Sequence, residues 1–236
     1  MNVNDATTGQ LPFRFGNYDR VNFDLFLPGE NTGVYQQLQQ LSTGKTSTCI
    51  YLWGQKGTGK SHLLQATCRN ASESGRNSIY IPSTQFDEIE PTMLQGLGSL
   101  DLVCVDDIDY LADNQAWEHA LLHLYNQLRD AQHSIVIAGN AAPNVIGIQL
   151  QDLKSRLSWG LTYYLKQLDD ETKMAVLKKR AEHRSFELTD EVAFYLLSRV
   201  ERDVQTLMGI LDKIDDASLA EQRKITIPFV KTLLDK

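Results

Sequence analysis

Hydrophobic residues along this chain follow one pattern in its earlier part and another in its later part. The earlier part contains short, continuous apolar runs rich in strand formers, separated by segments with apolar residues at helical spacing. Continuous apolar runs are typical of buried parallel strands, and strands that alternate with helices indicate an α/β fold. The sequence therefore predicts a parallel five-stranded sheet with strands at residues 49–53, 78–81, 102–105, 134–138 and 162–165.

The connections between these strands contain the helices expected in the α/β part. Segments 61–75 and 114–131 have apolar residues three and four apart, and residues 151–160 are predicted to form a helical turn. Asn31 precedes a further helical segment, and we expect its side chain to cap the first turn. Residues 83–99 are expected to form a polar connection with one weak helical turn.

The pattern changes near Lys166, where apolar runs give way to strong helix formers. Four successive segments have helical patterns, so a small all-α subdomain is expected at 166–236, after an α/β core at 22–165. Residues 1–21 begin with a polar stretch that lacks periodicity, which predicts a flexible tail. The helical segments are residues 169–184, 189–200, 203–217 and 227–234.

The most informative motif follows the first predicted strand and opens a helix. Residues 54–61 have the sequence GQKGTGKS, which fits the pattern of a phosphate-binding loop in the required context of strand, loop and helix. Glycines let backbone amides converge on phosphate oxygens at a helix N-terminus, where the helix dipole also favours anions. Lys60 is expected to reach the β-phosphate, and the Ser61 hydroxyl to bind Mg²⁺. The remaining candidate phosphate contacts are Gly54, Lys56, Gly57, Thr58, Gly59 and His62.

Polar residues also follow two other predicted strands. Asp106 and Asp107 end the run LVCV, and Asn140 follows the run IVIAG. Ligands bind at the carboxyl ends of the strands in such sheets, so these side chains are expected beside the phosphate loop. We expect Asp106 to hold Mg²⁺ directly or through water, and Asp107 to orient or deprotonate an attacking water. Asn140 either contacts the γ-phosphate or that water, or serves as an ordinary strand-end turn residue.

Composition limits the classes of partner. The chain has 236 residues, 42% of them hydrophobic, and a net charge of −7, which argues against broad binding to a nucleic-acid backbone. Its three cysteines lie far apart and include no C-x-x-C pair, so reduced core thiols are expected. No apolar run has membrane-spanning length, and no signal-peptide core is evident, which predicts a cytoplasmic protein.

A short apolar cluster, QLPFRF at residues 10–15, lies on the predicted tail. Physical reasoning leaves two alternatives: the cluster folds back onto its own domain, or it docks into a groove of a partner. It is also similar to the motif that binds the sliding clamp of DNA polymerase III. In that comparison Gln10 enters a polar subpocket and Leu11, Phe13 and Phe15 enter apolar ones, while Arg14 departs from the usual apolar residue.

Four motifs together resemble the AAA+ ATPases, and within them the clade of the initiator DnaA. They are GQKGTGKS, LVCVDDIDYL, IVIAGN and LKSRLSWGL, in the order and spacing of that clade, and the resemblance covers residues 22–236. It implies an α/β AAA+ core followed by a helical lid. Two parts of the initiator are not expected here, namely a basic DNA-binding domain after Lys236 and a basic insertion between Ile81 and Leu102. The chain is therefore most similar to regulatory members that inactivate the initiator.

The resemblance implies a negative regulator of replication initiation. Such a protein grips the β-subunit clamp loaded on DNA, meets ATP-bound DnaA and stimulates its ATP hydrolysis, touching DNA only through the clamp near the nucleoid. Arg156 matches the arginine finger offered in trans, and Arg202 matches the second sensor, which contacts the β-phosphate. Phe26 and Leu27 match the adenine pocket. The implied cofactor is ADP or another nucleoside diphosphate with Mg²⁺, with ATP also possible.

Two other functions remain open from sequence alone. The phosphate loop and acid pair are intact, so an autonomous AAA+ ATPase, acting as a motor or helicase loader, is the main alternative. A DNA-binding initiator paralogue is the second, and the acidic charge counts against it. Self-association and the strength of any intrinsic ATPase activity are left undetermined.

Overall fold

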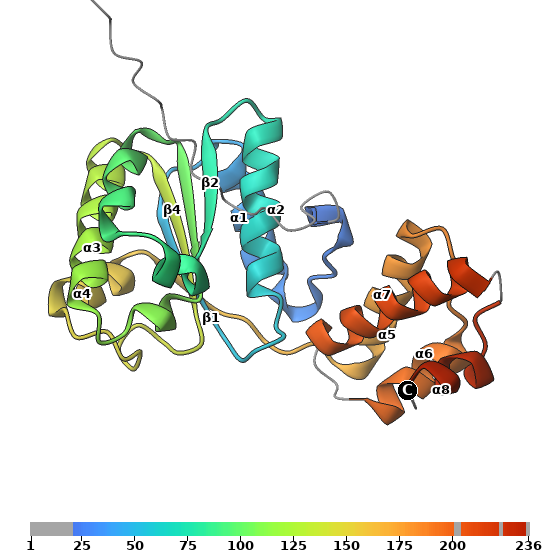
Figure 1. The fold of residues 1–236 in the computed structure, drawn as a ribbon. Helices are drawn as coiled ribbons and strands as arrows, with labels where there is room; N and C mark the ends of the chain where they lie inside the picture. Colours follow the sequence, from blue (N-terminus) through green and yellow to red (C-terminus); the bar gives the residue numbers. More distant parts are fainter. Residues whose placement is uncertain (1–20, 201–203, 222–223, 235–236) are drawn as a thin grey trace, which may run out of the picture.

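The computed structural model describes residues 21–200, 204–221 and 224–234. These residues contain a five-stranded parallel sheet with strand order β2-β3-β4-β1-β5 (Figure 1). The predicted α/β fold with its parallel five-stranded sheet is confirmed. The strands are β1 Cys49–Trp53, β2 Ser78–Pro82, β3 Leu102–Asp106, β4 Ser134–Gly139 and β5 Leu161–Tyr164.

The sheet separates two hydrophobic clusters because successive side chains of a strand point to opposite faces. Tyr51 packs in one cluster, while Ile50 and Leu52 pack in the other. Both faces are apolar and covered, which explains the continuous apolar runs in the sequence. One face carries α1 Thr32–Ser42 and α2 Lys60–Glu73, and the other carries α3 Gln115–Asp130 and α4 Gln151–Trp159.

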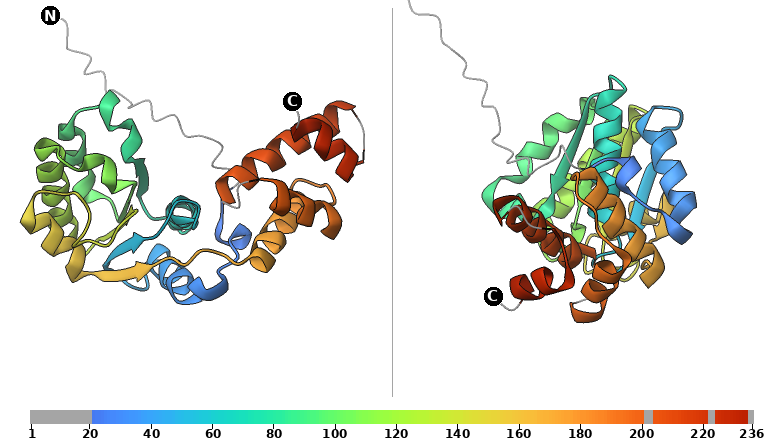
Figure 2. Two further views of the ribbon diagram at one scale, coloured as in Figure 1. Left: turned by 90° about the horizontal axis from the view of Figure 1, so that it is seen from below. Right: turned by 90° about the vertical axis from the view of Figure 1, so that its right-hand side faces the viewer.

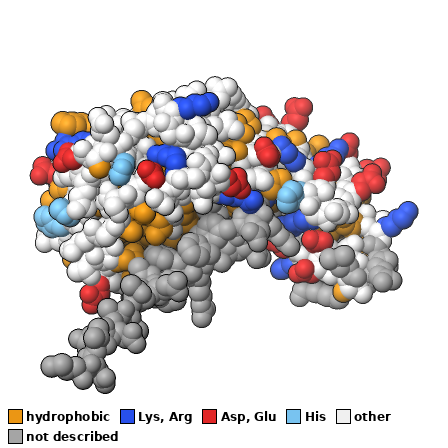
Figure 3. Space-filling view, turned by 90° about the horizontal axis from the view of Figure 1, so that it is seen from above, with side chains coloured by type: hydrophobic (Ala, Val, Ile, Leu, Met, Phe, Trp, Pro, Cys, Tyr) orange, Lys and Arg blue, Asp and Glu red, His pale blue; other side chains and the backbone are white. Residues whose placement is uncertain are grey.

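The last part of the described chain is helical and has its own hydrophobic cluster, which includes Leu177, Leu196 and Leu211. Its helices are α5 Asp170–His183, α6 Asp190–Arg199, α7 Val204–Glu221 and α8 Ile227–Leu234. Figure 2 shows this helical lobe beside the α/β lobe, with the segment after β5 crossing between them. In the face drawn in Figure 3, acidic side chains are most frequent over the helical lobe.

Two expectations about the connections were wrong. Residues 83–99 form two 3-10 helices, Ser83–Glu88 and Pro91–Ser99, and not a polar connection with one weak turn. They pack on α3, where the rings of Phe86 and Trp117 stack with centroids 3.9 Å apart. The apolar residues of this segment are too irregularly spaced to give a helical or strand period, which is why the sequence pattern missed them.

Asn31 does not cap α1 with its side chain. Its amide instead forms a pair of hydrogen bonds with the backbone of Lys166, donating to the carbonyl at 3.1 Å and accepting from the N–H at 2.9 Å. Asn31 is buried, so these bonds satisfy polar groups that water does not reach. The side chain therefore joins the start of α1 to the crossing between the two lobes.

Within the described residues, no helix is long and apolar enough to span a membrane.

Candidate functional site

The phosphate loop connects β1 to α2 at the carboxyl end of the sheet. Gly59 has a φ of +93° and forms the N-cap of α2, which has no side-chain cap. A Cβ at Gly59 would lie 2.7 Å from the Phe26 ring, and one at Gly54 would lie 2.6 Å from the Leu165 carbonyl oxygen. The loop is thus packed between neighbours where only glycine fits. The first amides of α2 lack a side-chain acceptor, as an anion-binding helix N-terminus requires.

Lys60 is 5% exposed and holds its ammonium group inside the loop. Its Nζ donates to the carbonyls of Gly54 and Gln55 at 2.8 and 3.2 Å and to Asn140 Oδ1 at 3.1 Å. Burial lowers the pKa of Lys60, and the carboxylates of Asp106 and its neighbours oppose that shift. The ammonium group is therefore fixed at the junction of β1 and β4, where it can meet a phosphate oxygen.

The predicted acid pair occupies two different environments. Asp106 is 1% exposed, and its carboxylate accepts from the Tyr80 hydroxyl at 2.8 Å and from the Asp107 N–H at 3.0 Å. Asp107 has a φ of +52° and lines the cavity described below. Burial and the nearby Asp106 carboxylate raise the pKa of Asp107, and Lys60 opposes this shift. Only the second carboxylate of the pair thus faces the cavity directly.

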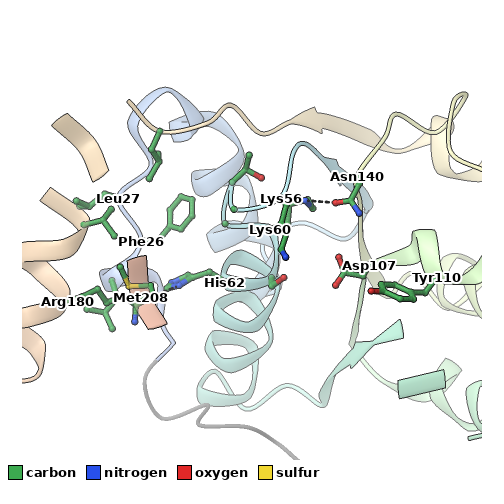
Figure 4. A pocket seen from close by; sticks show the side chains of 17 residues that line it. Phe26, Leu27, Lys56, Lys60, His62, Asp107, Tyr110, Asn140, Arg180 and Met208 are labelled. Atoms are coloured by element: carbon green, nitrogen blue, oxygen red, sulfur yellow. Dashed lines mark hydrogen bonds between the residues drawn. The ribbon is translucent and has the colours of Figure 1, made fainter. Parts of the chain in front are cut away.

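Asn140 follows β4 and is held on two sides. Its backbone N–H donates to Asp109 Oδ2 at 2.8 Å, and its side-chain oxygen accepts from Lys60. Tyr51, from the neighbouring strand β1, donates its hydroxyl to the Ala141 carbonyl at 2.8 Å and so fixes the chain that follows. The Asn140 side chain is therefore turned toward Lys60 of the phosphate loop (Figure 4).

A cavity of about 570 Å³ lies between the phosphate loop and the helical lobe, within the size range of small-molecule sites. Figure 4 shows Lys60, Asn140 and Asp107 at one end and Phe26, Leu27 and Met208 at the other. The polar end suits phosphates and the apolar end suits a ring system. The predicted residues that line it are Phe26, Leu27, Lys56, Gly57, Thr58, Gly59, Lys60, Ser61, His62, Asp107 and Asn140.

The helical lobe reaches the site through residues that sequence reasoning missed. Arg180 donates from its guanidinium group to His62 Nδ1 at 2.7 Å, and His62 Nε2 lies 2.8 Å from the Asn22 carbonyl. Burial and the positive charge of Arg180 lower the pKa of His62 to about 4, so the ring is neutral and donates through Nε2. Val176 also lines the cavity. Val176 and Arg180 are four residues apart on α5 and so share one face of the helix. This spacing was the only sign in the sequence that both could face the same site.

The other predicted residues lie elsewhere. Gly54 and Asp106 support the loop and β3 from behind the cavity lining, and Arg156 is outside that lining. Arg202 and the tail residues Gln10, Leu11, Phe13 and Phe15 lie outside the described residues. Further lining residues that the sequence did not indicate are Leu25, Tyr110, Leu168, Val176, Arg180 and Met208.

Arg156 lies on α4, across the sheet from the helical lobe. Its guanidinium carbon is 4.5 Å from the centroid of the Trp159 ring. Among the described residues, no carboxylate forms an ion pair with Arg156. Helix α4 itself is anchored by the fully buried Glu118, whose carboxylate accepts from the backbone N–H of Gln149 and of Leu150 just before the helix. The arginine thus lies on a fixed helix, stacked on Trp159 and without a carboxylate partner in the part of the chain that is described.

Comparisons with known proteins agree with this geometry. Residues 18–164 match the family model of the bacterial DnaA ATPase domain, and residues 170–234 match the model of the Hda lid domain.

Several solved structures have a similar fold. AMPPCP-bound DnaA from Aquifex aeolicus is 25% identical with a TM-score of 0.71, and the match covers 83% of this chain and 65% of that one. Domain III of the Thermotoga maritima replication initiation protein DnaA is 23% identical with a TM-score of 0.80, covering 91% and 95%. Thermotoga maritima RuvB is 18% identical with a TM-score of 0.70, covering 92% and 72%. The last two show likeness of fold alone.

The chain spans about two thirds of the length of the Aquifex DnaA that it matches. Its α/β part is matched by the DnaA model over more than half of the chain, and its helical part by a different, Hda-specific model. This chain therefore belongs to the bacterial DnaA ATPase domain family, within the AAA+ proteins, and resembles Hda in its lid.

Proposed function

We propose that the cavity binds an adenine nucleotide, with ADP as the resident form. The amides of residues 57–61 and the Lys60 ammonium group surround the diphosphate, and the Phe26–Leu27 segment with Met208 encloses the base. The nucleotide in the Aquifex DnaA structure is AMPPCP, a triphosphate analogue. In this chain Arg180 and His62 join the lid to the first turn of α2, so an occupied loop fixes the lid angle.

The same site offers oxygen ligands of the kind that Mg²⁺ prefers. Ser61 follows Lys60 at the cavity wall, and Asp106 lies behind it at the end of β3. Both Asp106 oxygens already accept one hydrogen bond, and each retains a second lone pair. This donor set fits Mg²⁺ held by Ser61, with Asp106 acting through water, and bound Mg²⁺ would neutralise charge on the phosphates.

For the whole chain we propose a regulatory role: it limits replication initiation by stimulating ATP hydrolysis on DnaA. The match to the lid of Hda, the regulatory inactivator of DnaA, supports this role over that of an initiator. The observation that carries the proposal is the position of Arg156. It is absent from the lining of the chain's own cavity and has no ion-pair partner in the part of the chain that is described. An arginine placed in this way is available to the nucleotide of a second protein.

The proposed encounter takes place on the sliding clamp. Gln10, Leu11, Phe13 and Phe15 resemble a clamp-binding motif, so a clamp loaded on DNA would hold this chain near DnaA. Tethering raises the effective concentration of the two proteins without adding a contact between them. DNA then acts only through the clamp, and the protein works in the cytoplasm near the nucleoid.

The test uses DnaA loaded with labelled ATP, together with clamp-loaded DNA. Wild-type chain is compared with Arg156→Ala, with a Gln10→Ala/Leu11→Ala double variant, and with Arg199→Ala as a matched exposed arginine on the lid. We expect wild type and Arg199→Ala to stimulate hydrolysis, and Arg156→Ala to lose about 10³-fold or more of that effect. The tail variant should need far more protein for the same rate. Equal stimulation by Arg156→Ala would refute the role in trans.

A second function is favoured by one observation. Lys60 donates to Asn140, and Asp107 lines the same cavity, an arrangement that would support hydrolysis of a nucleotide bound to this chain. An autonomous AAA+ ATPase would turn over ATP without DnaA and would lose this activity in Asp107→Asn. The regulator that we propose would keep its effect on DnaA in the same variant.

A further inference from the structure

Trp159 is the last residue of α4 and one of the most exposed large hydrophobic residues described, with 70% of its surface accessible. Its ring lies under the guanidinium group of Arg156, three residues earlier on the same helix, at 4.5 Å from ring centroid to guanidinium carbon. Residues three apart on a helix are neighbours, so this contact is built into the helix geometry. Because the Trp159 ring is largely exposed, packing in the hydrophobic core does not account for a tryptophan at this position.

The backbone that carries the ring is fixed even though the ring is exposed. Leu153 and Leu157 of α4 are fully buried in the cluster on this side of the sheet. At Gly160, directly after Trp159, a Cβ would overlap the carbonyl oxygen of Cys49 in β1. The end of α4 is therefore packed closely against the start of β1, and this fixed backbone carries the Trp159 ring.

A guanidinium group is attracted to the face of an aromatic ring, and tryptophan is the strongest partner. A half-buried arginine such as Arg156, without such a contact, would distribute among more rotamers, and each encounter with a partner would have to select one of them. Stacking uses the face of a guanidinium group and not its N–H groups, so the contact with Trp159 can reduce the number of Arg156 conformations without using its hydrogen-bond donors. The contact is thus suited to holding the arginine extended before the partner arrives.

We propose that Trp159 is a positioning residue for Arg156: its ring holds the guanidinium group in the orientation in which it meets the nucleotide of DnaA. This inference rests on the proposed function, because it assigns Trp159 a part in the same reaction in trans. Trp159 acts through Arg156 and touches no nucleotide itself. A tryptophan that served only as an apolar contact would instead set how tightly the two proteins bind.

The experiment measures single-turnover hydrolysis of ATP on DnaA, with clamp-loaded DNA, over a range of concentrations of this chain. Trp159→Leu keeps an apolar side chain but removes the aromatic face, and Trp159→Phe keeps a face. Phe194→Leu is the matched control, because Phe194 is an exposed aromatic of the lid, at 68% accessible, far from α4 in the sequence. Arg156→Ala reports whether the arginine works in trans at all. Thermal unfolding of each variant shows that the fold is intact.

For Trp159→Leu we expect the maximal rate to fall about two- to fivefold, with the half-saturating concentration unchanged. Trp159→Phe should recover most of the rate, and Phe194→Leu should match wild type. In nuclear magnetic resonance spectra, the upfield ring-current shift of the Arg156 side-chain protons should disappear in Trp159→Leu.

Two results would overturn the inference while leaving the proposed function in place. One is a maximal rate for Trp159→Leu equal to wild type while Arg156→Ala is inactive. The other is a change confined to the half-saturating concentration, which would make Trp159 a contact residue. If Arg156→Ala itself stimulates normally, the proposed function fails and the inference fails with it.

Discussion

Replacing Glu118 with alanine tests whether a buried carboxylate on α3 holds the helix that carries Arg156. Glu118 is fully buried and accepts from Gln149 N–H at 3.0 Å and from Leu150 N–H at 2.7 Å, immediately before α4 begins. Helix α4 has no side-chain cap from its own N-cap residue. The Glu118 carboxylate therefore supplies, from another helix, the acceptor and negative charge that a helix N-terminus favours.

The magnitude follows from these contacts. Each hydrogen bond to a charged group contributes about 1.5–3 kcal/mol, and two backbone donors would lose their acceptor, so Glu118→Ala should lower the free energy of unfolding by about 3–5 kcal/mol. Glu118→Gln keeps one acceptor oxygen but directs an NH₂ group at a donor, and should lose about half as much. Glu73→Ala is the control, because Glu73 forms an exposed pair with Arg69 and should cost less than about 1 kcal/mol.

Urea denaturation measures the free energy of unfolding, and hydrogen exchange measures opening of the N-terminal turn of α4. We expect Glu118→Ala to lose stability and to exchange faster at residues 149–153 than elsewhere in the core. Stimulation of DnaA should fall with it, since Arg156 lies on the loosened helix. A free energy of unfolding within about 1 kcal/mol of wild type, or faster exchange that spares α4, would refute the anchoring role.

Three further predictions concern the cavity and the crossing between the lobes. In the folded state His62 has a pKa of about 4, below its ordinary 6.5, so at intermediate pH the unfolded chain binds a proton that the folded chain does not. The free energy of unfolding should therefore fall by about 2–3 kcal/mol as the pH drops from 7 to 4. In urea titrations His62→Gln should flatten this pH dependence, and an unchanged pH dependence would contradict the role of Arg180 and burial. Lys60→Ala should weaken ADP binding about 10- to 100-fold by calorimetry, and near-normal affinity would place the diphosphate elsewhere. Asn31→Ala should lower the midpoint of thermal unfolding through a loss of about 2–3 kcal/mol, because both bonds to the Lys166 backbone disappear; a loss below about 0.5 kcal/mol would show that the pair contributes little.

The parts of the fold that follow local rules could be predicted from the sequence. The parallel five-stranded sheet was predicted, although its strand order was not, and the phosphate loop and Asn140 meet as expected because parallel strands end at one edge. The pattern of residues 54–61 is sufficient for the loop, since its glycines, lysine and serine carry the geometry within eight positions. These predictions needed periodicity and one motif, without knowledge of distant contacts.

The parts that depend on distant pairs could not be predicted in this way. Asn31 has the residue type and position of a helix cap, yet its partner Lys166 is 135 residues away and its buried surroundings favour that bond. Glu118 has the position of an ordinary residue in the first turn of α3, and only the fold brings residues 149 and 150 to its carboxylate. Arg180 likewise reaches His62 across 118 positions. Local sequence patterns predict only a surface or helix-capping role for each of these residues. Their actual partners are set by tertiary contacts, which local patterns do not contain.

The central claim is that this chain acts on the nucleotide of another protein. The most direct test is a single-turnover experiment in which only DnaA carries labelled ATP, this chain carries unlabelled ADP, and the clamp is loaded on DNA. We predict that label is released from DnaA with the wild-type chain and remains bound with Arg156→Ala. Release that requires ATP on this chain, or that proceeds equally with Arg156→Ala, would contradict the claim and leave an autonomous ATPase as the better explanation.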